Sequence, residues 1–200
     1  MVRRPQRKGK HRVLGMAFIL VSLAFATLLR NNLWKDDYTI WSDAARKNPS
    51  SYRAQVEMGI ALTRAGEYTG AIPYLKKAIS LSPAREEGYF NMGLTLAFLG
   101  RDKEAIGYLE KVIRLNPGSF KAYNSLAIRY AMSGGYEEAL GFIRKGIEIE
   151  PGYPLFYNTL GNILYDGFNK KEEAEKAYRK AISLDPDLDL PKKNLERMKK

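Results

Sequence analysis

The chain has 200 residues, with 33 Lys and Arg against 22 Asp and Glu, one His and no Cys. This length allows one or two domains with a substantial core, and a hydrophobic content of 45% excludes a disordered chain. The absence of Cys excludes a disulfide scaffold, thiolate metal ligands and a cysteine nucleophile. Of the net charge of +11, residues 1–30 carry +7, so the rest of the chain is close to balanced and does not indicate nucleic-acid binding.

The first 30 residues have the pattern of a membrane signal. Residues 1–12 form a basic leader, and Val13 to Leu29 carry no charge. As a helix this apolar run spans roughly 25 Å, the short end of what crosses a bilayer. We expect residues 13–30 to form a transmembrane signal anchor, with the basic leader in the cytoplasm. A signal peptide cleaved after Ala24-Phe25-Ala26 is the alternative, and it places the body on the same side.

Prolines mark an internal repeat in the body of the chain. Pro49, Pro83, Pro117 and Pro151 are spaced by 34 residues, and Pro186 follows after 35. Upstream of each proline from Pro83 onward lie two amphipathic segments joined by a glycine. The first segments share a one-face motif with a small residue at its centre: Gln55-x-x-Met58-Gly59, Tyr89-x-x-Met92-Gly93, Tyr123-x-x-Leu126-Ala127 and Tyr157-x-x-Leu160-Gly161.

This pattern resembles the tetratricopeptide repeat, whose signature W-x2-L-G-x2-Y…A-x3-F…P spans 34 residues. The resemblance implies an all-α fold, a right-handed superhelix of helix–turn–helix units, here preceded by one N-terminal transmembrane helix. We assign four repeats to residues 50–186, at about 52–85, 86–119, 120–153 and 154–188. Residues 31–49 are expected to form a half-repeat helix that joins the membrane to the array, and residues 187–200 a C-terminal capping helix.

Two departures from the repeat pattern predict local changes. Pro73 lies inside the second helix of repeat one, which is therefore expected to start late or to bend. In the regular pattern, each first helix is expected to end at a glycine: Gly66, Gly100, Gly134 or Gly167. In repeat four the stretch from Gly167 to Ala174 is longer than in the other copies, so its turn is expected to differ.

The residue types needed for catalysis are scarce. The only histidine, His11, lies in the basic leader, so no His-dependent triad or metal cluster is predicted. Acid pairs such as Glu86-Glu87 fall near predicted helix starts, where they complement the helix dipole. We therefore expect a binding protein and not an enzyme, with no catalytic residue, no cofactor and no metal.

In the tetratricopeptide family, one face of each first helix lines the concave side of the superhelix. The resemblance places a groove for a protein or an extended peptide there. The expected partner-binding residues are Val56, Ile60, Phe90, Leu94, Phe98, Asn124, Ile128, Met132, Asn158, Asn162 and Tyr165. This groove is apolar in repeats one to three and rich in amides in repeat four, whose donors and acceptors suit a peptide backbone.

The sequence thus predicts a membrane-anchored scaffold for protein–protein interaction on the extracytoplasmic face, most simply of a bacterial inner membrane. An alternative belongs to another class. The segment from Leu28 to Pro49 resembles the junction between the last span and the repeat tail of multi-pass protein O-mannosyltransferases. That resemblance implies a separated or truncated tail of a membrane glycosyltransferase, which acts as its substrate-recognition module.

Overall fold

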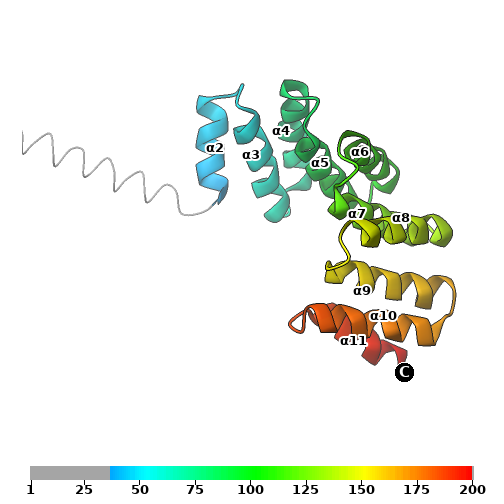
Figure 1. Ribbon diagram of the computed structural model, residues 1–200. Helices are drawn as coiled ribbons and strands as arrows, with labels where there is room; N and C mark the ends of the chain where they lie inside the picture. The colour runs from blue at the N-terminus through cyan, green and yellow to red at the C-terminus, as the bar shows by residue number, and fades with distance from the viewer. Residues whose placement is uncertain (1–36, 200) are drawn as a thin grey trace, which may run out of the picture.

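The computed structural model describes residues 37–199, and within this range the regular structure is entirely helical. The expected leader and membrane span lie outside the described residues. Among the described helices, none combines the length and the apolar character needed to cross a bilayer. The helices follow one another along a curved solenoid, as Figure 1 shows.

Helix–turn–helix pairs build this solenoid. The first helices of the four repeats are α3 (Tyr52–Arg64), α5 (Glu86–Phe98), α7 (Phe120–Met132) and α9 (Pro154–Asn162), the last continued by the π-helical segment η1 (Ile163–Gly167). The second helices are α4 (Tyr68–Leu81), α6 (Asp102–Leu115), α8 (Tyr136–Ile149) and α10 (Lys171–Leu184). The helices at the two ends are α2 (Asp37–Lys47) and α11 (Asp189–Met198). In Figure 1, α6 and α8 lie on the outer side of the curve.

In repeats one, two and four, a side chain of the second helix enters a gap left by a glycine of the first. A Cβ atom at Gly93 would lie only 2.8 Å from Cγ of Leu109, and one at Gly59 only 2.6 Å from Cγ of Leu75. Both leucines are completely buried. The small residues predicted from the motif are therefore the points of closest approach between paired helices.

The first three turns share one geometry. Gly66, Gly100 and Gly134 have φ values of 81°, 72° and 86°, the left-handed conformation that favours glycine. In each turn a backbone N–H just beyond the glycine donates to a carbonyl five residues earlier, as Arg101 does to Leu96 (2.9 Å). These glycines therefore end the first helices as predicted.

Repeat four corrects one prediction. Gly167 does not adopt the left-handed conformation, and Asn169 takes that role with a φ of 50°. The closing bond runs from the N–H of Lys170 to the carbonyl of Leu164 (2.9 Å), six residues instead of five. One inserted residue is thus absorbed by η1, since a π-helical turn accommodates one extra residue. Gly167 instead makes room for the ring of Tyr136, whose Cγ would lie 2.4 Å from an added Cβ.

Pro73 does not delay the helix that contains it. Helix α4 begins at Tyr68, the same repeat position as Asp102 in α6 and Tyr136 in α8. Pro73 therefore lies in the second turn of a helix of ordinary length. A late start of α4, one of the two expected effects, is not observed.

The gap at Gly93 gives a direct test of helix pairing. We expect Gly93→Ala to destabilise the protein by about 1–3 kcal/mol, because the added methyl overlaps Leu109. Gly107→Ala on α6 is the matched control, since a Cβ there meets no atom within 4 Å. Helix propensity should make that control about 0.5–1 kcal/mol more stable. Thermal melts of both variants, followed by circular dichroism, check this; equal shifts would contradict the pairing.

Candidate functional site: the inner face of the first helices

The structure divides the expected partner-binding residues into three groups by exposure. Phe98 and Met132 are exposed, at 62% and 67% of their surface. Six more are half-buried: Ile60, Phe90, Leu94, Ile128, Asn162 and Tyr165. The remaining three, Val56, Asn124 and Asn158, are buried inside the array, with exposures of 1%, 7% and 7%. The part of this set open to a partner is therefore concentrated on α5, α7 and the end of α9.

An apolar hollow lies between α5 and α7. Leu94, Phe98 and Ile128 contribute to its lining, and its volume is about 120 Å³. The ring of Phe98 stacks on Tyr68 at the start of α4, with ring centroids 5.3 Å apart. This contact holds an exposed aromatic ring in place, so the hollow is defined before any partner arrives.

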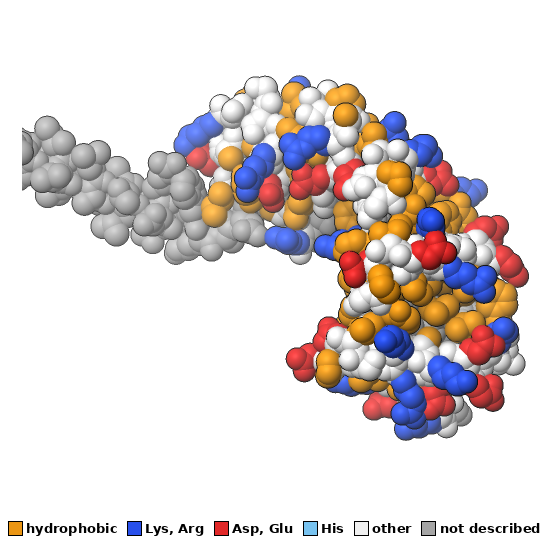
Figure 2. Space-filling model, in the orientation of Figure 1, with side chains coloured by type: hydrophobic (Ala, Val, Ile, Leu, Met, Phe, Trp, Pro, Cys, Tyr) orange, Lys and Arg blue, Asp and Glu red, His pale blue; other side chains and the backbone are white. Residues whose placement is uncertain are grey.

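A second, larger hollow of about 360 Å³ continues from the first between α7 and the end of α9. Ile128 lines both hollows, and Met132 and Asn162 join it in the second. Figure 2 shows hydrophobic side chains along the inner edge of the curve in this region. Five of the predicted residues, which we call the inner strip, are thus brought together in one continuous surface: Leu94, Phe98, Ile128, Met132 and Asn162.

Phe90 lies apart from this surface. It lines a separate hollow of about 380 Å³ with Glu86, Asn116 and Phe120, near the other end of α5. The amide of Asn116 donates to the Glu86 carboxylate across that hollow (3.0 Å). The structure therefore does not join Phe90 to the inner strip.

The polar end of the groove is held by the C-terminal helix. Nδ2 of Asn194, on α11, donates to the side-chain oxygens of both Asn158 and Asn162 (3.0 Å each). The hydroxyl of Tyr178 also donates to the Asn162 oxygen (2.8 Å). The amides expected to meet a peptide backbone thus already have their oxygens occupied by the chain itself.

Two site residues on α11, Asn194 and Arg197, were missed by the sequence reasoning. Arg197 lines the larger hollow and donates to both carboxylate oxygens of Asp166, at 3.1 and 3.2 Å. Its guanidinium also lies over the ring of Tyr165, 5.1 Å from the centroid. The signal was present, because Arg197 follows Asn162 by 35 residues, which is the length of repeat four. Extending the groove-facing positions of the repeat frame into the capping helix would have found it.

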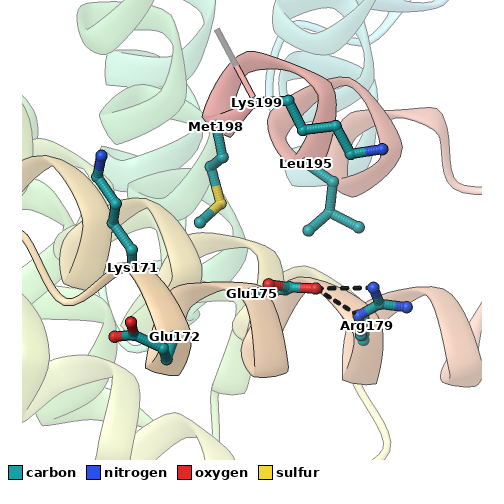
Figure 3. A pocket seen from close by; sticks show the side chains of 7 residues that line it. All are labelled: Lys171, Glu172, Glu175, Arg179, Leu195, Met198 and Lys199. Atoms are coloured by element: carbon teal, nitrogen blue, oxygen red, sulfur yellow. Dashed lines mark hydrogen bonds and ion pairs between the residues drawn. The ribbon is translucent and has the colours of Figure 1, made fainter.

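The outer end of the array carries a different kind of hollow. Figure 3 shows Leu195 and Met198 on α11 above α10, where Arg179 forms an ion pair with Glu175 (2.7 Å). The lining of this hollow of about 380 Å³ is mainly charged. Within residues 37–199, no cluster of acidic, His or Cys side chains is arranged to hold a metal ion.

The buried phenol of Tyr178 makes stability depend on pH. Burial raises the pKa of Tyr178 to about 12, so the folded chain keeps the phenol proton at pH values where the unfolded chain loses it. This contribution is fully present below pH ~10 and is lost as the pH rises toward 12. We expect Tyr178→Phe to cost about 1 kcal/mol at pH 8 through the lost hydrogen bond and to decline less steeply above pH ~10. Urea midpoints across this range check it; an unchanged decline would contradict it.

Comparisons with known proteins agree with this architecture. Three family models described as tetratricopeptide repeat match residues 24–86, 62–127 and 155–188, and the first begins inside the expected membrane span. No curated protein matches the chain. A crystal structure of MamA is 26% identical, with a TM-score of 0.64 over 73% of this chain and 85% of that one.

Two further solved structures share the fold at lower identity. YrrB, described as a tetratricopeptide-repeat protein with an unusual peptide-binding site, is 24% identical, with a TM-score of 0.64 over 86% of this chain and 89% of its own. A tetratricopeptide-repeat protein from Thermus thermophilus, TTC0263, is 21% identical, with a TM-score of 0.70 over 80% of this chain and 87% of its own. The matched family models together span most of the array, which is built of tetratricopeptide repeats.

Proposed function

We propose that this chain is a membrane-anchored scaffold that binds an extended segment of a partner protein along the inner strip. The observation that carries the proposal is the exposure of Phe98 and Met132 on neighbouring first helices. Burying such a side chain against a partner contributes about 1.5–3 kcal/mol, which makes both residues candidates for binding hot spots.

The shape of the groove favours an extended segment. The two hollows share Ile128, and each suits large apolar side chains of a ligand that runs from α5 toward α9. At the far end, the oxygen of Asn162 already accepts two hydrogen bonds, which directs its NH2 group away from these donors. That NH2 group is suited to donate to a carbonyl of the bound backbone.

The comparisons support a peptide ligand at the level of the fold. Tetratricopeptide repeats are scaffolds for protein interaction, and YrrB, of the same fold, is described by its peptide-binding site. The groove of this chain is distinguished by two exposed apolar side chains, Phe98 and Met132. They lie between the ion pair at Asp166 and the N-terminal repeat.

The anchoring part of the proposal concerns residues 13–30. Their uncharged run and the basic leader before it favour a span with the N-terminus in the cytoplasm and the repeats on the extracytoplasmic side. The alternative, a repeat tail of a membrane O-mannosyltransferase, rests on the junction at residues 28–49 and assigns the same groove to substrate recognition. A longer reading frame, or a glycosyltransferase encoded upstream, would favour that alternative.

The groove is tested by photo-crosslinking in cells. A photoreactive phenylalanine analogue at Met132 should crosslink a partner, and the same analogue at Gly107, exposed on α6, should not. Adding Phe98→Gln should abolish the Met132 crosslink while changing the unfolding free energy by about 1 kcal/mol or less, because Phe98 is exposed. Leu96→Gln, at a buried position two residues away, should cost about 3 kcal/mol or more. Equal crosslinking at positions 132 and 107, or a large loss of stability in Phe98→Gln, would overturn the groove.

The topology is tested by protease accessibility. In spheroplasts, added protease should digest the array, residues 50–186, while a tag before residue 13 stays protected until the membrane is permeabilised. This follows from six basic residues before the expected span and a nearly balanced flank after it. Digestion of the tag with protection of the array would reverse the orientation.

A further inference from the structure

The N-terminal helix of the array has an open apolar face. In the repeat frame, Trp41 and Ala44 precede Leu75 and Ala78 by 34 residues, and both of these later residues are completely buried. On α2, Trp41 and Ala44 pack on one side against the core cluster that contains Met58 and Leu75 but stay half-buried, and Tyr38, one turn earlier, is 46% exposed. Helix α2 packs on α3, whereas the other second helices have a first helix on both sides. Its second side is left without that cover among residues 37–199.

We propose that this open face of α2 docks on the surface of the membrane that anchors the chain. The proposal rests on the anchor proposed above. If the span ends at residue 30, six residues separate it from α2, which begins at Asp37. Six residues reach at most about 20 Å, so the start of α2 is held close to the head-group layer.

The side chains on this face suit the interface between lipid and water. Tyr38 and Trp41 are three residues apart and lie on neighbouring parts of one helix surface. Tyrosine and tryptophan concentrate at head-group depth because an apolar ring and a polar tip meet the two environments together. A ring that would be a core residue in a complete repeat is thus placed where it can enter the lipid interface.

The charges around this face favour anionic head groups. Arg46 and Lys47 share the single carboxylate of Asp43, at 2.9 and 2.6 Å, and their side chains are 78% and 63% exposed. The guanidinium of Arg53 lies 5.9 Å from the Trp41 ring centroid. Figure 2 shows basic side chains at this end of the array. Arg53 is paired with Glu57 (3.9 Å), and Asp37 lies at the start of α2, so the excess positive charge is confined to the end of the helix that carries Arg46 and Lys47. This end of the face, its basic rim, attracts negatively charged lipid.

Trp41 itself can report the docking. The chain has two tryptophans, so Trp34→Phe leaves Trp41 as the single tryptophan, which is excited selectively over tyrosine at long wavelength. The full-length variant is placed in nanodiscs of phosphatidylglycerol whose acyl chains carry bromine near the head groups. We expect Trp41 to lose fluorescence in these nanodiscs relative to unbrominated ones and to resist quenching by iodide in water. The matched control removes both tryptophans and adds Tyr108→Trp on α6, and it should show the opposite response.

A variant without the two basic side chains at the rim of the face, Arg46 and Lys47, tests whether they contribute to docking. Arg46→Gln with Lys47→Gln, both at exposed positions, should reduce the loss of Trp41 fluorescence caused by bromine and leave the thermal melt unchanged. In the protein that keeps Arg46 and Lys47, replacing the brominated phosphatidylglycerol by a brominated zwitterionic lipid should likewise reduce the loss of Trp41 fluorescence.

Each other outcome overturns the docking in a distinguishable way. A chain that does not co-elute with the nanodiscs lacks the anchor, and both proposals fail. A chain that co-elutes but whose Trp41 is quenched by iodide as strongly as the control is anchored with α2 free of lipid. Trp41 shielded from bromine and iodide alike is covered by protein, either by residues 24–36, where a repeat match begins, or by a second copy.

Discussion

Every feature of the array depends on how closely the two helices of a repeat approach. The first helix has no Cβ at Gly59, Gly93 and Gly161, and the second helix fills each gap with a buried side chain. This close contact fixes the spacing between the two helices of a repeat. It therefore also fixes the angle at which successive helix pairs stack. The inner strip exists because α5 is held from behind by the gap at Gly93 and α7 by the packing of its small residue Ala127 in one buried cluster with Ile143, which turns their other faces toward the groove.

The size of the filling side chain accounts for a difference between repeats. Repeats one and two use leucine, whereas repeat four uses Tyr178, whose ring would lie 2.4 Å from a Cβ at Gly161. The longer side chain carries a hydroxyl through the core to Asn162, at the edge of the groove. Packing inside the repeat and polarity on the groove are thus linked through one residue. The same phenol makes alkaline pH a probe of this end of the array.

The repeat spacing was sufficient to predict the fold, because prolines and small residues recur at positions with a strict physical requirement. It was not sufficient to place the insertion in repeat four, since both Gly167 and Asn169 are residues that end helices. Only the hydrogen bond from Lys170 to Leu164 shows where the extra residue enters. For the candidate site, the repeat frame predicted which way each side chain points but not how deeply it is buried. Val56 is buried because it packs with Tyr52 and Ala78, a contact that no single-helix pattern encodes.

Exposure on the inner face is set by position along each helix. Phe98 and Met132 are the last residues of α5 and α7, and both are exposed there. The corresponding positions in repeats one and four are Arg64 and Asp166, which makes the row apolar in the middle and charged at its ends. Asp166 is already paired with Arg197, so its charge is largely balanced by the capping helix. A ligand of the groove proposed above would therefore gain most of its affinity from the two central apolar contacts, while the charged ends would limit how far it could shift along the row.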